Sequence, residues 1–356
     1  MSHNLKNVKI SRDEDAWEVN LEAEIPADTL ARYREEALKE MQRDAKLDGF
    51  RPGKAPMERI LQVYGEQAVL RHAAQHAIEH ELPELLAGEQ YLIIEAPRVE
   101  TETPETGKPL HFKARAALAP QVEAADYKKI ARKINAEKEE ISVSDTEHAE
   151  ALTHLRRERA RIDKMESGTE AAKAAEEVRA LAEADLPALD DMFVQSLGYE
   201  SAEKFSEALR ANIKTEKEMQ AREKRRAAML DELVKESTFR FPATMREYEL
   251  NDMEARMQDD ISRIGMTFDA YLAQVKKTRE QLRIDWKETA DKRAQVRLIL
   301  AEIARKENVE PDAKKLEHEL EQAKKHYPAA DAQALRAHIA HALRNDATLE
   351  FLENQT

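Results

Sequence analysis

The sequence predicts an α+β N-terminal domain followed by an elongated, all-α C-terminal domain with helical arms. Alternating apolar and polar residues, the pattern of strands, occur only before about residue 119. Charged residues make up 36% of the 356 residues, aromatic residues only 5%, and there are 8 glycines. That composition is typical of long helices with wide solvated faces, and the length allows two or three domains of ordinary size.

The N-terminal segment reads as a β-hairpin that leads into a helix. Residues 5–11 and 16–25 alternate with period two, and the polar residues 12–15 form the turn between them. Pro26 and the acidic residue Asp28 open a helix that we expect to reach about residue 46. One face of the second strand is apolar and is expected to be buried: Trp17, Val19, Leu21, Ala23 and Ile25.

Two further helices and two extended segments complete the first domain. Pro56 begins a short helix, Gly65 ends it, and a longer helix follows over about 66–88. Residues 91–103 and 108–119 return to extended patterns. We therefore place an α+β domain at 1–119.

The rest of the chain reads as a linker followed by helices. Residues 120–140 are predicted to be an extended linker, and residues 141–185 a helix with a short connection. Ser144, followed three residues later by Glu147, is a helix start signal. Residues 186–356 are helical in pattern, with final helices expected at about 312–326 and 331–353. Basic runs such as Lys224-Arg225-Arg226 are interpreted as solvated helix faces because acids flank them.

Charge and cysteine content restrict the function classes. The net charge is −14, from 71 acids and 57 bases, so DNA is not expected as a partner, and any RNA contact must come from a local patch. The absence of cysteine excludes disulfides, thiolate metal sites and cysteine nucleophiles. Neither a secretory signal nor an apolar run of membrane-spanning length is visible, so we expect a cytoplasmic protein without a membrane partner.

Residues 49–56 form the most distinctive stretch of the chain. These eight residues contain two glycines, two prolines, one phenylalanine and two cations, with no acid. Glycine allows positive φ and proline fixes φ, so the loop can be stiff and exposed together. Cations beside an aromatic ring suit a surface of phosphate and protein. From composition alone, a tight turn between two helices with an incidentally exposed Phe50 is the commoner interpretation.

The same stretch resembles the ribosome-docking signature of the trigger factor family. The match covers all six fixed positions of that signature, and residues 1–140 and 186–356 follow the order of the family's N-terminal and C-terminal domains. The matching positions, which the resemblance implies to be ribosome-binding, are Gly49, Phe50, Arg51, Gly53, Lys54 and Pro56.

The resemblance implies an ATP-independent chaperone that docks on the large ribosomal subunit at the tunnel exit and shelters nascent polypeptides. It implies no cofactor and no metal, and it leaves room for a weak homodimer. Methionine and aromatic residues of the C-terminal helices are candidates for client contact, because methionine adapts to varied apolar surfaces. The candidate client-binding residues are Met253, Met257, Met266, Phe268 and Tyr271.

The chain departs from the family between these two parts. The family normally inserts an FKBP-type prolyl isomerase domain of about 100 residues there, a usual size for one domain. Only residues 166–185 stand in this place, with one glycine, no aromatic residue and no strand pattern. We therefore expect a trigger factor form that lacks the isomerase domain and has no catalytic residues.

Other functions remain as alternatives. His76-x-x-Glu79-His80 fits an inverted zinc-protease pattern and, with His72, places three histidines at spacing four on one helix face. A solvated helix face is the commoner meaning of that pattern. Bound-metal analysis and a prolyl isomerisation assay separate a hydrolase or residual isomerase from a chaperone. A ribosome-free holdase is the third alternative, and the intact signature argues against it.

Overall fold

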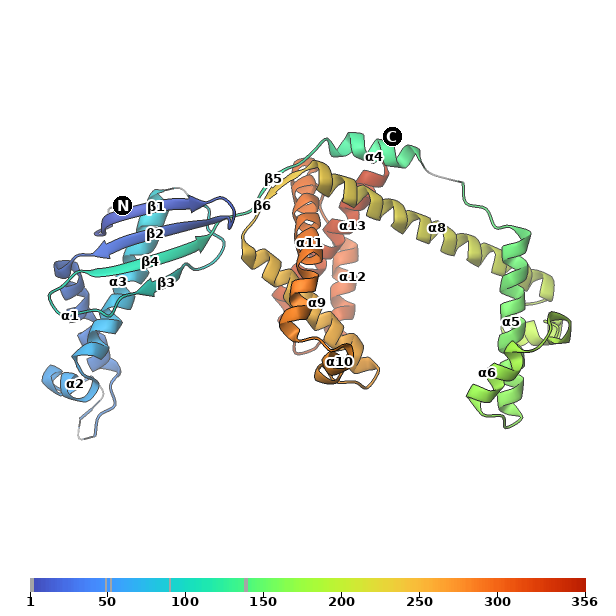
Figure 1. Ribbon diagram of the computed structural model, residues 1–356, viewed down its shortest axis with the longest axis horizontal. Coiled ribbons are helices and arrows are strands. Elements are labelled where there is room, and N and C mark those ends of the chain that lie inside the picture. The colour runs from blue at the N-terminus through green and yellow to red at the C-terminus, as the bar shows by residue number, and fades with distance from the viewer. Residues whose placement is uncertain (1–2, 49, 52, 90, 138–139) are drawn as a thin grey trace. The chain divides into compact units, whose positions relative to one another are not determined.

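The structure is a computed structural model, and it describes residues 3–48, 50–51, 53–89, 91–137 and 140–356 (Figure 1). Its contacts divide the chain into two compact units, each built from two separate stretches. The first unit combines Met1–Ala125 with Glu236–Asn308, and the second combines Asp126–Lys235 with Val309–Thr356. The sequence led us to expect domains that follow one another along the chain, whereas each of these two units combines an earlier stretch with a later one.

A four-stranded antiparallel sheet begins the first unit. Its strands are β1 (Lys6–Asp13), β2 (Glu18–Ile25), β3 (Arg98–Thr101) and β4 (Leu110–Ala117), in the order β1-β2-β4-β3. The predicted apolar face of β2 is confirmed, since Trp17, Val19, Leu21, Ala23 and Ile25 are all 4% exposed or less.

Helices α1 (Ala27–Asp44) and α3 (Glu66–Gly88) pack on each other and share one apolar core with the sheet (Figure 1). The short helix α2 (Met57–Tyr64) lies between them in the chain and buries Ile60. Buried Glu81 of α3 accepts hydrogen bonds from the backbone N of Asn4 (2.5 Å) and the hydroxyl of Tyr33 (3.0 Å). These partners satisfy a carboxylate that would otherwise be costly to bury.

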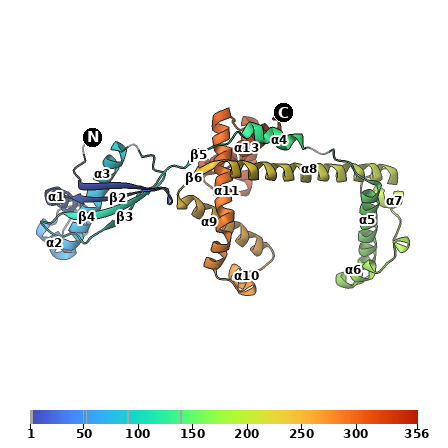
Figure 2. The same cartoon turned by 45° about the horizontal axis from the view of Figure 1, so that its top comes forward.

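The remainder of the first unit is a helical hairpin. Strand β6 (Thr238–Arg240) pairs with β5 (Gln121–Glu123), and α9 (Ala243–Arg263), α10 (Phe268–Val275) and α11 (Arg279–Glu307) follow. Figure 2 shows α9 and α11 side by side, with α10 in the connection between them. Thr267 caps α10 through the backbone N of Ala270, as its place before the helix predicts.

The described residues of the second unit form helices and the connections between them, with no strand assigned among them. Ser144 and Glu147 form a complete capping box at the start of α5, which confirms that start signal. Its helices are α4 (Tyr127–Ala136), α5 (Asp145–Glu166), α6 (Ala171–Arg179), the 3₁₀ turn η1 (Glu183–Asp185), α7 (Asp191–Ser196), α8 (Ala202–Glu236), α12 (Ala313–His326) and α13 (Ala332–Glu353).

The prediction of an extended linker over residues 120–140 is wrong. Strand β5 occupies its start, and Asp126 then caps helix α4 by accepting from the backbone N of Lys129. Asn135 of α4 donates to the carbonyl oxygens of Leu352 and Glu353 at 3.0 and 3.1 Å. Partners far along the chain thus stabilise α4. The helix is too short for its sequence pattern alone to predict it.

The interpretation of residues 224–226 as part of a solvated helix face is also wrong for one residue, Arg226. Arg226 is only 13% exposed and pairs with Glu353 of α13 at 2.9 Å. In the part of the chain that the structure describes, no helix is long and apolar enough to cross a membrane.

Candidate functional site

The loop between α1 and α2 is anchored at its C-terminal end. Pro56 caps α2, and the carbonyl oxygen of Ala55 accepts a 2.6 Å hydrogen bond from Nε2 of Gln42, on the last turn of α1. Ala55 itself is 2% exposed and belongs to the core. Gly53 has φ +75°, and a Cβ added there would lie 3.7 Å from the backbone of Arg43. The end of the loop is therefore fixed against α1.

Two backbone hydrogen bonds fold the tip of the loop. The N–H of Phe50 donates to the carbonyl oxygen of Leu47 (3.1 Å), and the N–H of Lys54 donates to that of Arg51 (3.0 Å). Bonds that span three residues are those of tight turns. Gly49, one of the predicted site residues, and Pro52 lie outside the described residues.

The side chains at the tip face solvent. Phe50 is 41% exposed, and Arg51 and Lys54 are exposed without an ion pair among the described side chains. At the base of the loop, by contrast, Arg43 donates a hydrogen bond to Asp44 and lowers the pKa of Asp44. The charge of Arg43 is therefore already matched by an anion. The tip thus offers one aromatic ring and two unmatched cations, the groups that bind phosphate and stack on a flat apolar surface.

The five predicted client residues lie between the middle of α9 and α10. Met253 and Met257 belong to α9, Met266 to the turn after it, and Phe268 and Tyr271 to α10. All five are half-buried. Part of each side chain therefore contributes to helix packing, and part remains accessible.

More exposed apolar side chains occur in the same hairpin, and sequence reasoning did not select them. Ile264 is 75% exposed, Ile284 71% and Tyr248 58%. Ile264 directly follows Arg263, and Ile284 lies between Arg283 and Asp285. A β-branched residue next to a charged residue in the chain is the signal that could have identified these two.

Two buried carboxylates hold α9 and α11 together behind this surface. Glu249, 2% exposed, accepts from Nε of Arg293 (3.0 Å) and Nε of Arg297 (2.7 Å). Glu254, 4% exposed, pairs with Arg279 and with Arg283. Each buried charge therefore has two cationic partners, the condition under which an ion pair survives burial.

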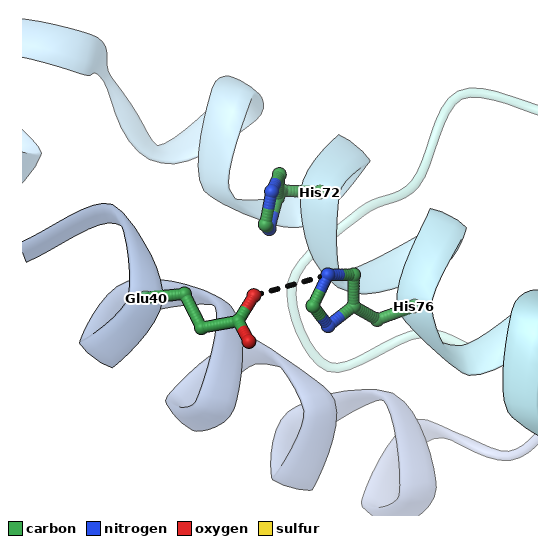
Figure 3. Close-up of side chains that lie close together, drawn as sticks. All are labelled: Glu40, His72 and His76. Atoms are coloured by element: carbon green, nitrogen blue, oxygen red, sulfur yellow. Dashed lines mark ion pairs between the residues drawn. The ribbon is translucent and has the colours of Figure 1, made fainter. Parts of the chain in front are cut away.

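The histidine pattern of α3 does not assemble as the inverted zinc-protease motif. His80 lies against the ring of Tyr33 (centroids 6.1 Å apart), and Glu79 accepts from Gln75 on its own helix. His72 and His76 come together instead, with ring centroids 4.6 Å apart, and Nε2 of His76 lies 3.1 Å from Oε2 of Glu40 on α1 (Figure 3). The two histidines that meet are therefore His72 and His76, whereas the motif requires His76 and His80, one turn later.

An α+β domain with an exposed cationic loop is followed in this chain by a mostly helical part with apolar side chains on its surface. Residues 6–155 match the family model described as bacterial trigger factor protein, and residues 201–354 match that of the bacterial trigger factor C-terminus. These matches define the class of the protein, a molecular chaperone. The chain belongs to the trigger factor family.

Individual relatives agree with this assignment. The chain is 24% identical to a trigger factor of Thermus thermophilus, over 88% of this chain and 89% of that one. It is 24% identical to that of Caldicellulosiruptor saccharolyticus, over 79% and 80%. A solved structure of the trigger factor chaperone, described for promiscuous substrate recognition in folding and assembly, is 16% identical with a TM-score of 0.53, covering 98% of this chain and all of that one.

The stretch between the two matched regions confirms the short form of the family. Residues 156–200 hold the end of α5, then α6, η1 and α7, and no strand is assigned within them. A barrel of about 100 residues, an ordinary domain size, cannot be built from this segment.

Proposed function

We propose that the protein docks on the large ribosomal subunit near the tunnel exit through Phe50, Arg51 and Lys54, in the cytoplasm. Gly53 and Pro56 shape the loop, and Gly49 is the remaining residue of the predicted docking site. One observation carries the proposal: the loop is fixed at its base by Gln42 while its ring and both cations remain exposed. A preorganised tip loses little conformational freedom on binding, which strengthens a small contact.

Charge supports ribosomal RNA as part of the docking surface. A chain of net charge −14 is repelled by phosphate as a whole, so local unmatched cations must provide the attraction. Each phosphate neutralised by a cation contributes roughly 0.7 to 0.9 to the slope of log affinity against log salt. Removal of both Arg51 and Lys54 is therefore expected to lower that slope by about 1.4 to 1.8.

Nascent or unfolded polypeptides are the proposed clients, held by exposed and half-buried apolar side chains of the α9–α11 hairpin. Ile264, Ile284 and Tyr248 add to the five predicted residues Met253, Met257, Met266, Phe268 and Tyr271. Burying one such side chain is worth about 1.5–3 kcal/mol, so a few contacts bind a segment that still dissociates readily. Release in this mechanism requires no nucleotide.

The docking test is salt-controlled co-sedimentation with vacant and translating ribosomes. The variant Phe50→Ala/Arg51→Ala/Lys54→Ala is compared with Leu92→Ala/Arg98→Ala/Lys108→Ala, which removes the same kinds of exposed side chain elsewhere in the first unit. We expect the loop variant to lose binding at physiological salt and the control variant to retain it, with unchanged circular dichroism for both.

Equal sedimentation of the two variants, or none of the unmodified protein, would contradict docking and favour a ribosome-free holdase. Suppression of aggregation of a denatured client distinguishes that second function, because it requires only the helical surface. Analytical ultracentrifugation over a concentration series tests the weak homodimer for which the family resemblance leaves room.

A further inference from the structure

Three side chains with metal-binding donors meet between α1 and α3, outside the loop and the client surface. Glu40 lies one turn before the end of α1, and His72 and His76 lie one turn apart on α3. One ligand atom from each lies within 4.8 Å of the others (Figure 3). All three residues are half-buried, so an ion can reach them from solvent.

The spacing of these donors is close to that of a bound metal. In a tetrahedral site with metal–ligand distances near 2.0–2.2 Å, ligand atoms are separated by about 3.3–3.6 Å. Oε2 of Glu40 and Nε2 of His76 already lie 3.1 Å apart. Histidines at positions i and i+4 share one helix face, so a modest rotation of the His72 side chain closes the remaining gap.

The environment of His72 also favours a ligand. Its Nδ1 atom is buried and has no hydrogen-bond partner among the described residues. Leaving a buried polar atom unpaired costs about 1–3 kcal/mol. A metal bound at Nδ1 of His72 would give this atom a partner and would fix the tautomer of the ring. The exposed His80, in contrast, is directed to the ring of Tyr33 and takes no part in the cluster.

We propose that Glu40, His72 and His76 bind one divalent transition-metal ion of the zinc or cobalt type. Two imidazoles and a carboxylate prefer such ions to magnesium or calcium, which favour sites made of oxygen alone. Three protein ligands leave one coordination position for water. Glu79, the acid that the inverted zinc-protease pattern would supply, is bonded to Gln75 and lies outside the cluster. The site therefore binds an ion without forming that protease centre.

The position of the site gives the ion a structural effect. A metal shared by Glu40 and the two histidines joins α1 to α3. Glu40 stands just ahead of Gln42 and Arg43 in the chain, and these two residues contact the end of the loop. An ion that binds only the folded protein stabilises it, and above the dissociation constant this stabilisation rises with the logarithm of the ion concentration. The inference does not rest on ribosome docking, because it concerns the two helices alone.

The test uses the full chain after removal of metal with a chelator. Zn²⁺ is titrated by calorimetry, and Co²⁺ is followed by visible absorption, which reports coordination directly. Glu40→Gln, His72→Gln and His76→Gln are compared with His80→Gln, a change of the same kind on the same helix. We expect one Zn²⁺ per chain, a four- or five-coordinate Co²⁺ spectrum, and a rise in melting temperature with Zn²⁺.

Each cluster variant should weaken Zn²⁺ binding at least about 10-fold, since even loss of an outer-shell partner typically has that effect. His80→Gln should bind as the unmodified protein does. The proposal is overturned if the unmodified protein gives no stoichiometric binding, if His80→Gln weakens binding as much as the cluster variants, or if Glu40→Gln, His72→Gln and His76→Gln all bind normally. Circular dichroism of each variant before metal addition shows that a loss of binding is not a loss of folding.

Discussion

Gln42 donates a 2.6 Å hydrogen bond from its side-chain Nε2 to the carbonyl oxygen of Ala55, which ties the end of the signature loop to the last turn of α1. The bond joins residues 13 positions apart and satisfies a carbonyl in a residue that is itself buried. Buried carbonyls without a partner are costly, so this contact fixes the path of the chain on the C-terminal side of the exposed tip.

The first prediction concerns that bond. Gln42→Ala should lower the free energy of unfolding by about 1 kcal/mol, because the Ala55 carbonyl loses its partner. It should weaken ribosome binding several-fold without changing the salt dependence, since both cations remain. Chemical denaturation and co-sedimentation at several salt concentrations measure the two effects. Gln62→Ala, which removes an exposed glutamine of α2, is the control and should change neither quantity.

The second prediction concerns Gly53, whose φ of +75° lies in the left-handed region. A Cβ there meets only ordinary contacts at 3.7 Å, so the cost of Gly53→Ala is mainly backbone strain, about 1–2 kcal/mol. Thermal unfolding measures it. Gly88→Ala, at the end of α3 and with open space around its Cβ, should be neutral or slightly stabilising. Equal destabilisation by both changes would show that the loop conformation is not the cause.

The third prediction concerns the buried carboxylate between α9 and α11. Glu249→Gln removes the charge that faces Arg293 and Arg297, both about one-third exposed. Because water reaches these arginines in part, we expect a loss near 2 kcal/mol rather than the 3–5 kcal/mol of a fully buried pair. Hydrogen exchange of α9 and α11 amides reports the local opening free energy.

A matched exposed pair is available as the control for this change. Glu100 lies 3.6 Å from Arg115, and both side chains are more than half exposed. Glu100→Gln should leave amide exchange in α9 unchanged, because exposed pairs contribute little. If Glu249→Gln also leaves α9 protected, the buried pair does not hold the hairpin.

The fourth prediction is a pH dependence of the second unit. Burial alone would raise the pKa of Glu353, but hydrogen bonds and positive charge from Arg222 and Arg226 outweigh it and lower that pKa from 4.5 to about 2. A depressed pKa in the folded state stabilises the protein above the unfolded value. That stabilisation is lost as the pH falls from about 4.5 toward 2.

Glu353→Gln should remove this part of the acid sensitivity. At neutral pH the variant should be less stable by about 2–3 kcal/mol, and its stability should change less between pH 5 and 3 than that of the unmodified protein. Denaturant midpoints at a series of pH values measure both. Parallel pH curves for the two proteins would mean that another carboxylate controls acid unfolding.

The apolar residues proposed for client binding on the α9–α11 hairpin show what a sequence pattern cannot predict. Met253 and Tyr271 are candidates by residue type and are half-buried, whereas Ile264 and Ile284 are far more exposed. Residue type indicates what a side chain can contact, but the rotation of a helix about its axis decides which side chains reach solvent. That rotation depends on packing against other helices.

By itself, the sequence determined the family, the strand and helix periods, the capping box at Ser144 and the composition of the loop at 49–56. These features depend on residues close together in the chain, whose spacing fixes local geometry. Only the tertiary structure decided that Arg226 meets Glu353, that Gln42 anchors Ala55, and that Glu40 joins His72 and His76. Each of these contacts lies beyond the reach of one helix or strand. How the elements pack decides which side chains meet, and no local pattern does so.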